Sequence, residues 1–147
     1  MIESIEIIDN LESLKGTCYL EIKPGKFTGE HWNEGSIFFT DETFTYFSNV
    51  IEKHCSKYSL WGMCEIDRET WKLIVEGLED IKLFLMANPN PYELTNYIGF
   101  LYPDTTEKYF KENFTQNLNG LIQVITEFQT WITAKIKKYE CISILGI

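Results

Sequence analysis

Apolar residues at helical spacing mark a long segment in the middle of this chain. Between Trp71 and Leu85 apolar side chains recur every three or four residues. Such spacing places them on one stripe of a helix that faces a core. Asp67 is a good N-cap, and the segment 88–91 (Asn-Pro-Asn-Pro) cannot continue a helix. We therefore predict a helix over residues 67–87.

Two further stretches carry the same spacing. One runs from Phe110 to Ile136 and ends in a group of lysines, which suit the dipole at a helix C-terminus. The other covers residues 41–55 and follows Thr40, whose hydroxyl can accept hydrogen bonds from the first N–H groups of a helix. The chain is therefore expected to form two long helices and one shorter helix.

Segments rich in β-branched residues indicate strands. Residues 2–8 and 17–23 alternate apolar and polar side chains in part. The last nine residues, 139–147, form a β-type run that we expect to insert into a sheet. Residues 58–64 are either a connection or a short strand, and 93–102 are either helix or strand. The fold class predicted is α+β, with a small, largely antiparallel sheet packed against two long helices and one shorter helix.

Length and composition are those of one domain covering residues 1–147. The 44% hydrophobic and 15% aromatic fractions supply enough apolar area to offset the entropy lost on folding. The N-terminus carries acid where a secretory signal would carry base, and no apolar run approaches the roughly 18 residues of a membrane span. We therefore expect a cytoplasmic protein that does not bind membranes, with four reduced and mostly buried cysteines.

Charge narrows the classes of partner. Thirteen basic and twenty-two acidic side chains give a net charge of −9, which repels phosphate and makes nucleic acid an unexpected partner. Residues 1–103 carry all of this excess, whereas residues 104–147 hold five acids and five bases. The acidity either keeps the protein soluble or forms a face that meets a basic partner.

No catalytic, metal-binding or cofactor-binding constellation is visible. His54 precedes Cys55, but neighbouring residues on a helix point about 100° apart and cannot form an activated pair. No C-x-x-C or H-x-x-x-H spacing supports a zinc site, and no glycine-rich phosphate loop is present. Paired catalytic carboxylates are not excluded by counting acids. We expect no enzyme activity, no metal and no cofactor.

Two segments place tryptophan among polar residues and glycines. They are residues 29–35 (Gly-Glu-His-Trp-Asn-Glu-Gly) and 59–63 (Ser-Leu-Trp-Gly-Met). Aromatic anchors ringed by polar groups are typical of interface centres, although these tryptophans could instead pack beneath loops. The candidate partner-binding residues are Glu30, His31, Trp32, Glu34, Trp61 and Glu65.

The order of several segments resembles that in a known family. An apolar strand precedes residues 38–44 (Phe-Phe-Thr-Asp-Glu-Thr-Phe), residues 66–71 (Ile-Asp-Arg-Glu-Thr-Trp) open a second helix, and residues 142–146 (Ile-Ser-Ile-Leu-Gly) close the chain. Over residues 36–147 this order resembles bacterial immunity proteins of contact-dependent growth inhibition systems. The resemblance implies a cytoplasmic antitoxin, not an enzyme, which forms a heterodimer with a cognate toxin domain, commonly a nuclease, and occludes its active site. No contact residues carry over from the family.

Two other functions remain open. The chain could be an acidic protein-binding adaptor or regulatory subunit unrelated to toxins, or a small enzyme or ligand-binding domain whose pocket the sequence does not reveal. A gene position directly downstream of a large secreted toxin would favour immunity over both.

Overall fold

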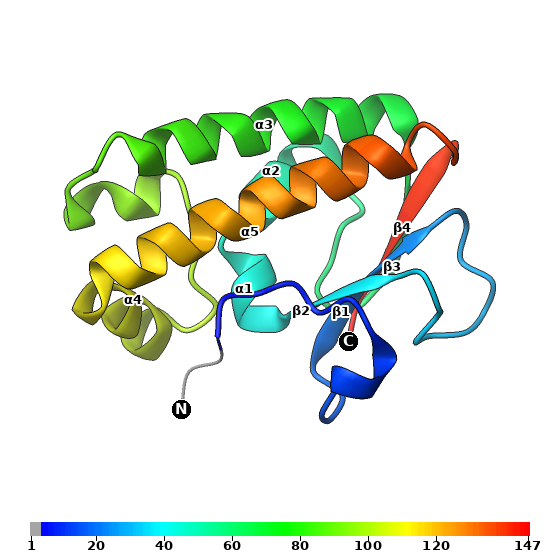
Figure 1. Ribbon diagram of the computed structural model, residues 1–147, viewed down its shortest axis with the longest axis horizontal. Coiled ribbons are helices and arrows are strands. Elements are labelled where there is room, and N and C mark those ends of the chain that lie inside the picture. Colours follow the sequence, from blue (N-terminus) through cyan, green and yellow to red (C-terminus); the bar gives the residue numbers. More distant parts are fainter. Residues whose placement is uncertain (1–3) are drawn as a thin grey trace.

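The computed structural model describes residues 4–147, in which two long helices cover one face of a four-stranded sheet (Figure 1). The strands are β1 (Tyr19–Pro24), β2 (Ile37–Thr40), β3 (Met63–Asp67) and β4 (Cys141–Leu145). The helices are α1 (Asp41–Thr45), α2 (Ser48–His54), α3 (Arg68–Met86), α4 (Lys108–Glu112) and α5 (Phe114–Lys135). Short 3₁₀ turns cover Leu11–Ser13 and Pro91–Asn96, and a π-helical turn covers Pro103–Glu107. The fold is of the α+β class, as predicted.

The last strand of the chain lies inside the sheet. The strand order is β2-β1-β4-β3, and each neighbouring pair is antiparallel. Ile144 of β4 is therefore paired with Ile22 on one side and Cys64 on the other. Residues 142–145 are all buried, because the sheet covers the edges of β4 and both of its faces are packed. The predicted insertion of the C-terminal strand is confirmed.

The long helix α3 begins and packs as its sequence pattern predicts. The Asp67 carboxylate accepts a hydrogen bond from the Thr70 N–H at 2.8 Å, which caps the helix. The stripe from Trp71 to Leu85 is buried, and Trp71 Nε1 donates to the Ile142 carbonyl oxygen at 3.1 Å. This bond joins α3 directly to the central strand β4.

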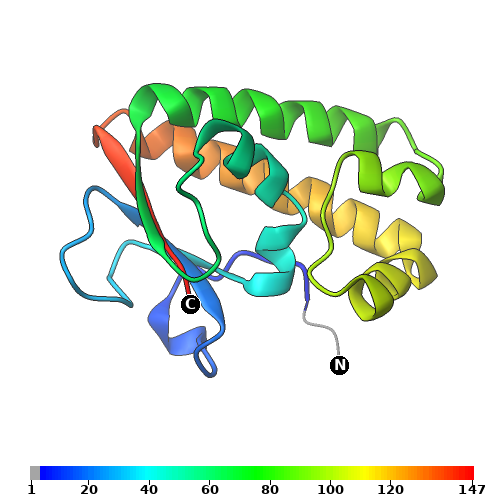
Figure 2. The same cartoon turned by 180° about the vertical axis from the view of Figure 1, so that it is seen from behind.

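Helices α2 and α3 pack closely against each other. Seen from behind, α2 lies under α3 (Figure 2), and the two helices are in contact. A Cβ at Gly77 of α3 would lie 2.7 Å from Cγ1 of Val50. The glycine therefore permits the close packing of α2 against α3.

The helix predicted over residues 41–55 is interrupted. Thr40 caps α1 as expected, but α1 ends at Thr45, the backbone leaves helical geometry at Phe47, and α2 begins at Ser48. Both aromatic side chains are buried, Tyr46 against Phe100 and Phe47 against a separate group of rings. The two adjacent side chains therefore pack against different aromatic groups at the point where the helix is interrupted.

The N-terminal strand and the unbroken last helix were wrong predictions. Within the described part of residues 2–8, only Ile8 pairs, as an isolated bridge to Phe38, because the 3₁₀ turn capped by Asn10 follows at once. The last helical segment is divided at Asn113, between α4 and α5. The side chain of Asn117 donates to the carbonyl oxygens of Tyr109 and Phe110 beside this break.

Candidate partner-binding surface

One face of the sheet turns away from the core and carries a long loop. Alternation in β1 sends Leu20 and Ile22 into the core and Glu21 to the opposite side. In β3, Cys64 and Ile66 are buried while Met63, Glu65 and Asp67 are exposed. We call this opposite side, with the loop of residues 25–36 that crosses it, the outer face.

A buried carboxylate holds this loop. Glu21 is only 3% exposed. Its Oε1 accepts a hydrogen bond from the Trp32 N–H at 2.6 Å; its Oε2 accepts from the Asn33 N–H at 2.9 Å, Asn33 Nδ2 at 2.9 Å and the Ser36 hydroxyl at 2.6 Å. No described cation forms an ion pair with it. Loop dipoles therefore solvate the charge, and the carboxylate in turn fixes the loop.

The anchor sets the position of Trp32. This residue has a φ of 67°, which non-glycine residues adopt only when their surroundings require it. Its ring packs edge-on against Tyr19 and stacks on Phe38, with centroid distances of 5.9 Å in both cases. The side chain remains 38% exposed. Trp32 is therefore half-packed beneath the loop and half-presented to solvent in one orientation.

Two further bonds tie the start of the loop to the sheet. The Phe27 N–H donates to Glu65 Oε2 at 2.9 Å, and the Ser143 hydroxyl donates to the Gly25 carbonyl oxygen at 2.7 Å. The His31 ring packs edge-on against Phe27 at 5.5 Å. The structure thus brings Glu65 of β3 to the loop that contains His31, although these two residues are 34 positions apart in the sequence.

The second predicted segment lies beside the C-terminal residues. Trp61 is 74% exposed, and the backbone around it accepts hydrogen bonds from Gly146 N–H and Ile147 N–H. A Cβ at Gly146 would lie 2.6 Å from the Gly62 carbonyl oxygen, so only glycine fits there.

The C-terminal residues connect the two aromatic segments. Gly146 and Ile147 line a cavity of about 160 Å³ together with Glu21, His31 and Trp32. No ring contact joins Trp32 to Trp61 among the described residues. Both segments therefore border the same two residues.

The acids of this region are free of ion pairs. Glu30, Glu34 and Glu65 are exposed, and within residues 4–147 no cation lies within ion-pair distance of them.

The sequence boundary at residue 103 does not separate two faces, because β4 lies in the sheet and α3 lies beside α5. Residues 4–67 hold eleven acids and five bases, a balance of −6, whereas residues 68–147 hold ten and eight, a balance of −2. The acidic excess belongs to the part that includes the outer face.

The four cysteines differ in burial. Cys18 is exposed, Cys55 and Cys141 are half-buried, and only Cys64 is buried, so the expectation that most are buried was wrong. Burial and the neighbouring Cys55 raise the pKa of the Cys64 thiol to about 12, which keeps it protonated near neutral pH. In the described part of the chain, no three His, Cys, Asp or Glu side chains are grouped closely enough to hold a metal.

Sequence reasoning missed Glu21. Its position between Leu20 and Ile22 in an alternating strand indicates an acid that faces solvent. The sequence feature that points to Glu21 is the pair of hydrogen-bond donors, Asn33 and Ser36, in a loop that needs an acceptor. Nothing local indicates which face of the sheet that loop crosses.

Comparison with known proteins gives no further identification. No protein-family model, curated protein or solved structure matches the chain. None of the helices in the described residues is long and apolar enough to cross a membrane. The function of the outer face must therefore be inferred from the geometry of its own residues.

Proposed function

We propose that this chain is a cytoplasmic immunity protein that binds a basic toxin domain, a nuclease, through the outer face of its sheet and occludes the toxin's active site. The observation that carries the proposal is that the exposed Trp61 and the loop that Glu21 holds in one conformation border the same two residues, Gly146 and Ile147. The order of the helix-opening and closing segments, which resembles that of immunity proteins, supports the same function. The proposal includes no catalytic step.

Preorganisation supports a binding role for the loop. Ordering loops and side chains at an interface costs free energy, and a loop that is already fixed avoids much of that cost. Trp32 is held by its N–H bond to Glu21 and by two ring contacts. Trp32 and Trp61 would then act as anchors, the residue type most enriched among interface hot spots.

The charge of the region supports a basic partner. Glu30, Glu34 and Glu65 are exposed acids without ion pairs among the described residues. A nuclease carries a basic cleft for its polyanionic substrate, so acids at the rim would steer association. The acids would set the rate of association and the tryptophans the lifetime of the complex.

Binding kinetics with a toxin domain test the proposal. The chain would be co-expressed with the C-terminal domain encoded directly upstream, and the purified pair studied at two salt concentrations. Trp61→Ala should cost about 2 kcal/mol or more through the off-rate, and Glu34→Gln about 1 kcal/mol or less through the on-rate. Added salt should slow association and leave dissociation almost unchanged.

An exposed aromatic elsewhere provides the matched control. Tyr92 is 85% exposed and lies in the turn beyond the C-terminal end of α3, so Tyr92→Ala should leave both rates unchanged. Wild-type binding by both Trp32→Ala and Trp61→Ala would move the interface away from the outer face. If no complex forms, the immunity function is wrong, and an adaptor role becomes the better hypothesis.

A further inference from the structure

A groove runs between α3 and α5 on the helical side of the molecule. Its larger part is a cavity of about 640 Å³ lined by residues of both helices and of the chain just after α5: Arg68, Lys72, Val75, Glu76, Thr133, Ile136 and Lys137. A second cavity of about 480 Å³ shares Val75, Thr133 and Lys137 with the first. The two cavities therefore form one continuous groove.

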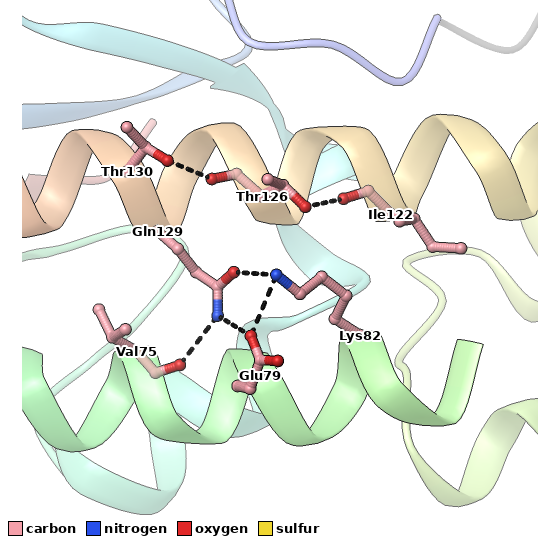
Figure 3. Close-up of polar contacts among 7 residues, drawn as sticks. All are labelled: Val75, Glu79, Lys82, Ile122, Thr126, Gln129 and Thr130. Carbon is pink, nitrogen blue, oxygen red and sulfur yellow. Dashed lines mark hydrogen bonds and ion pairs between the residues drawn. The ribbon is translucent and has the colours of Figure 1, made fainter. Parts of the chain in front are cut away.

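A polar clasp lies along the second part of this groove (Figure 3). Gln129 Nε2 donates to the Val75 carbonyl oxygen and to Glu79 Oε1, both at 3.1 Å. Lys82 Nζ lies 3.0 Å from Glu79 Oε1 and donates to Gln129 Oε1 at 2.9 Å. The clasp joins the two helices and neutralises its own acid and base.

The other end of the groove is cationic. Arg68, Lys72 and Lys137 line it, against the single acid Glu76. Lys72 pairs with Glu69 at 3.1 Å, but both side chains are exposed, and such surface pairs bind weakly.

Two of the three cations, Arg68 and Lys137, are not used in ion pairs within the described residues. Arg68 Nη2 donates to the Tyr139 carbonyl oxygen, while its Nε is buried without a hydrogen bond in the described part of the chain and is closed to a ligand. Lys137 has no ion pair among the described residues. On a chain of net charge −9, this end of the groove is a local site that attracts anions.

We propose that this groove binds a small organic anion with an apolar body, of the medium-chain carboxylate class. The carboxylate would lie among the three cations, and the chain would extend over Val75, Ile136 and Thr133 towards the clasp. The volume of the larger cavity falls within the range of about 300–1,000 Å³ found for small-ligand sites. Bare phosphate would satisfy the cations but leave the apolar part of the groove uncovered. The site is independent of the outer face and of the immunity function.

Decanoate is the probe for a titration followed by amide chemical shifts. We expect saturable shifts confined to residues 68–79 and 129–137, with a dissociation constant on the order of 1 mM or tighter for a ligand of this size. Decylammonium has the same chain and the opposite charge, and it should not saturate these shifts. Shifts spread over the whole protein, or equal binding of decylammonium, would overturn the site.

Charge and shape variants separate the two halves of the site. Lys137→Glu should weaken decanoate binding at least about fivefold. Lys108→Glu makes the same charge change at an exposed position on α4 outside the groove, and it should bind as the wild type does. Thr133→Phe keeps every cation but fills the groove, so it should abolish saturable binding. All three positions are exposed, and unchanged thermal unfolding would show that the variants fold. Wild-type affinity in Lys137→Glu would reject the proposal.

Discussion

On the outer face of the sheet, two carboxylates are held by neutral donors, whereas four carboxylates on the helical side pair with lysines. Glu21 accepts from two backbone N–H groups, an amide and a hydroxyl, and Glu65 accepts from the Phe27 N–H. On the helical side, four ion pairs join near neighbours in the sequence: Lys72–Glu69, Lys82–Glu79, Lys108–Glu112 and Lys111–Glu107.

This difference decides what each side can attract. Neutral donors leave the negative charge of the outer face in place, so that face is suited to a basic partner. Four ion pairs occupy part of the acid on the helical side, and the end of the α3–α5 groove is lined by three cations, Arg68, Lys72 and Lys137, against the one acid Glu76. The two proposed sites therefore follow from how each region neutralises its acids.

Removing β4 would destroy both regions together. Deleting residues 139–147 takes out the strand between β1 and β3 and the carbonyl group that accepts from Trp71. We expect a product without cooperative unfolding, because several fully buried apolar side chains are lost at once. Thermal unfolding followed by circular dichroism checks this. A truncated chain with a sharp transition would show that the sheet does not depend on β4.

The same substitution at two tryptophans compares the stability of the core beneath α3 with that of the outer face. Trp71→Ala should cost about 3–5 kcal/mol in the free energy of unfolding, because it opens a cavity under α3 and breaks the bond to Ile142. Trp61→Ala on the outer face should change stability by less than about 0.5 kcal/mol, since that side chain is mostly exposed. Urea denaturation measures both. Equal midpoints would contradict the burial of Trp71.

Glu21→Gln tests whether the carboxylate holds the loop. The amide replaces one carboxylate oxygen by an NH2 group, which then faces either the Trp32 N–H or the Asn33 N–H, so we expect a loss of about 2 kcal/mol. Hydrogen exchange at these two amides should accelerate at least about tenfold, while exchange within α3 changes less. Glu34→Gln removes an exposed acid from the same loop and serves as the control. Unchanged exchange at Trp32 would mean that the ring contacts alone fix the loop.

The smallest expected effect is the loss of stability when Glu79 of the clasp is replaced, and this loss depends on pH. The bond to Lys82, followed by the bond to Gln129, lowers the pKa of Glu79 in the folded state. Its contribution is therefore present above the ordinary glutamate pKa of about 4.3 and is lost as the pH falls through the lower, folded value. Glu79→Gln should cost less than about 1 kcal/mol at pH 7, and the cost should shrink as the pH falls below the ordinary glutamate pKa. Urea midpoints across the acid range test this, with Glu76→Gln, which has no ion pair in the described structure, as the control. A cost that does not shrink as the pH falls would contradict the ionic origin.

Sequence alone predicted the features that depend on near neighbours. The Asp67 cap and the stripe from Trp71 to Leu85 give α3, because capping and helical spacing act over a few residues. The apolar C-terminal run predicts a buried strand for the same reason. The sequence also predicted the α+β class, since the class follows from the order of such elements.

The candidate surface was predicted only in part. The residue pattern identified Trp61 as an aromatic among polar neighbours, and its exposure agrees with that interpretation. It could not place Glu65 beside the loop that carries Trp32, because strand pairing across β4 brings them together.

Tertiary structure decided the features that depend on distant partners. The helix over residues 41–55 is interrupted where two adjacent aromatic side chains pack against rings far along the chain. Glu21 is buried because a loop that begins after β1 folds back over it, and Gln129 links two helices some 50 positions apart. An alternating strand or a helical stripe assigns each residue to a side but not to a partner. The partner depends on which elements pack together, and that packing is set by the free energy of the whole core.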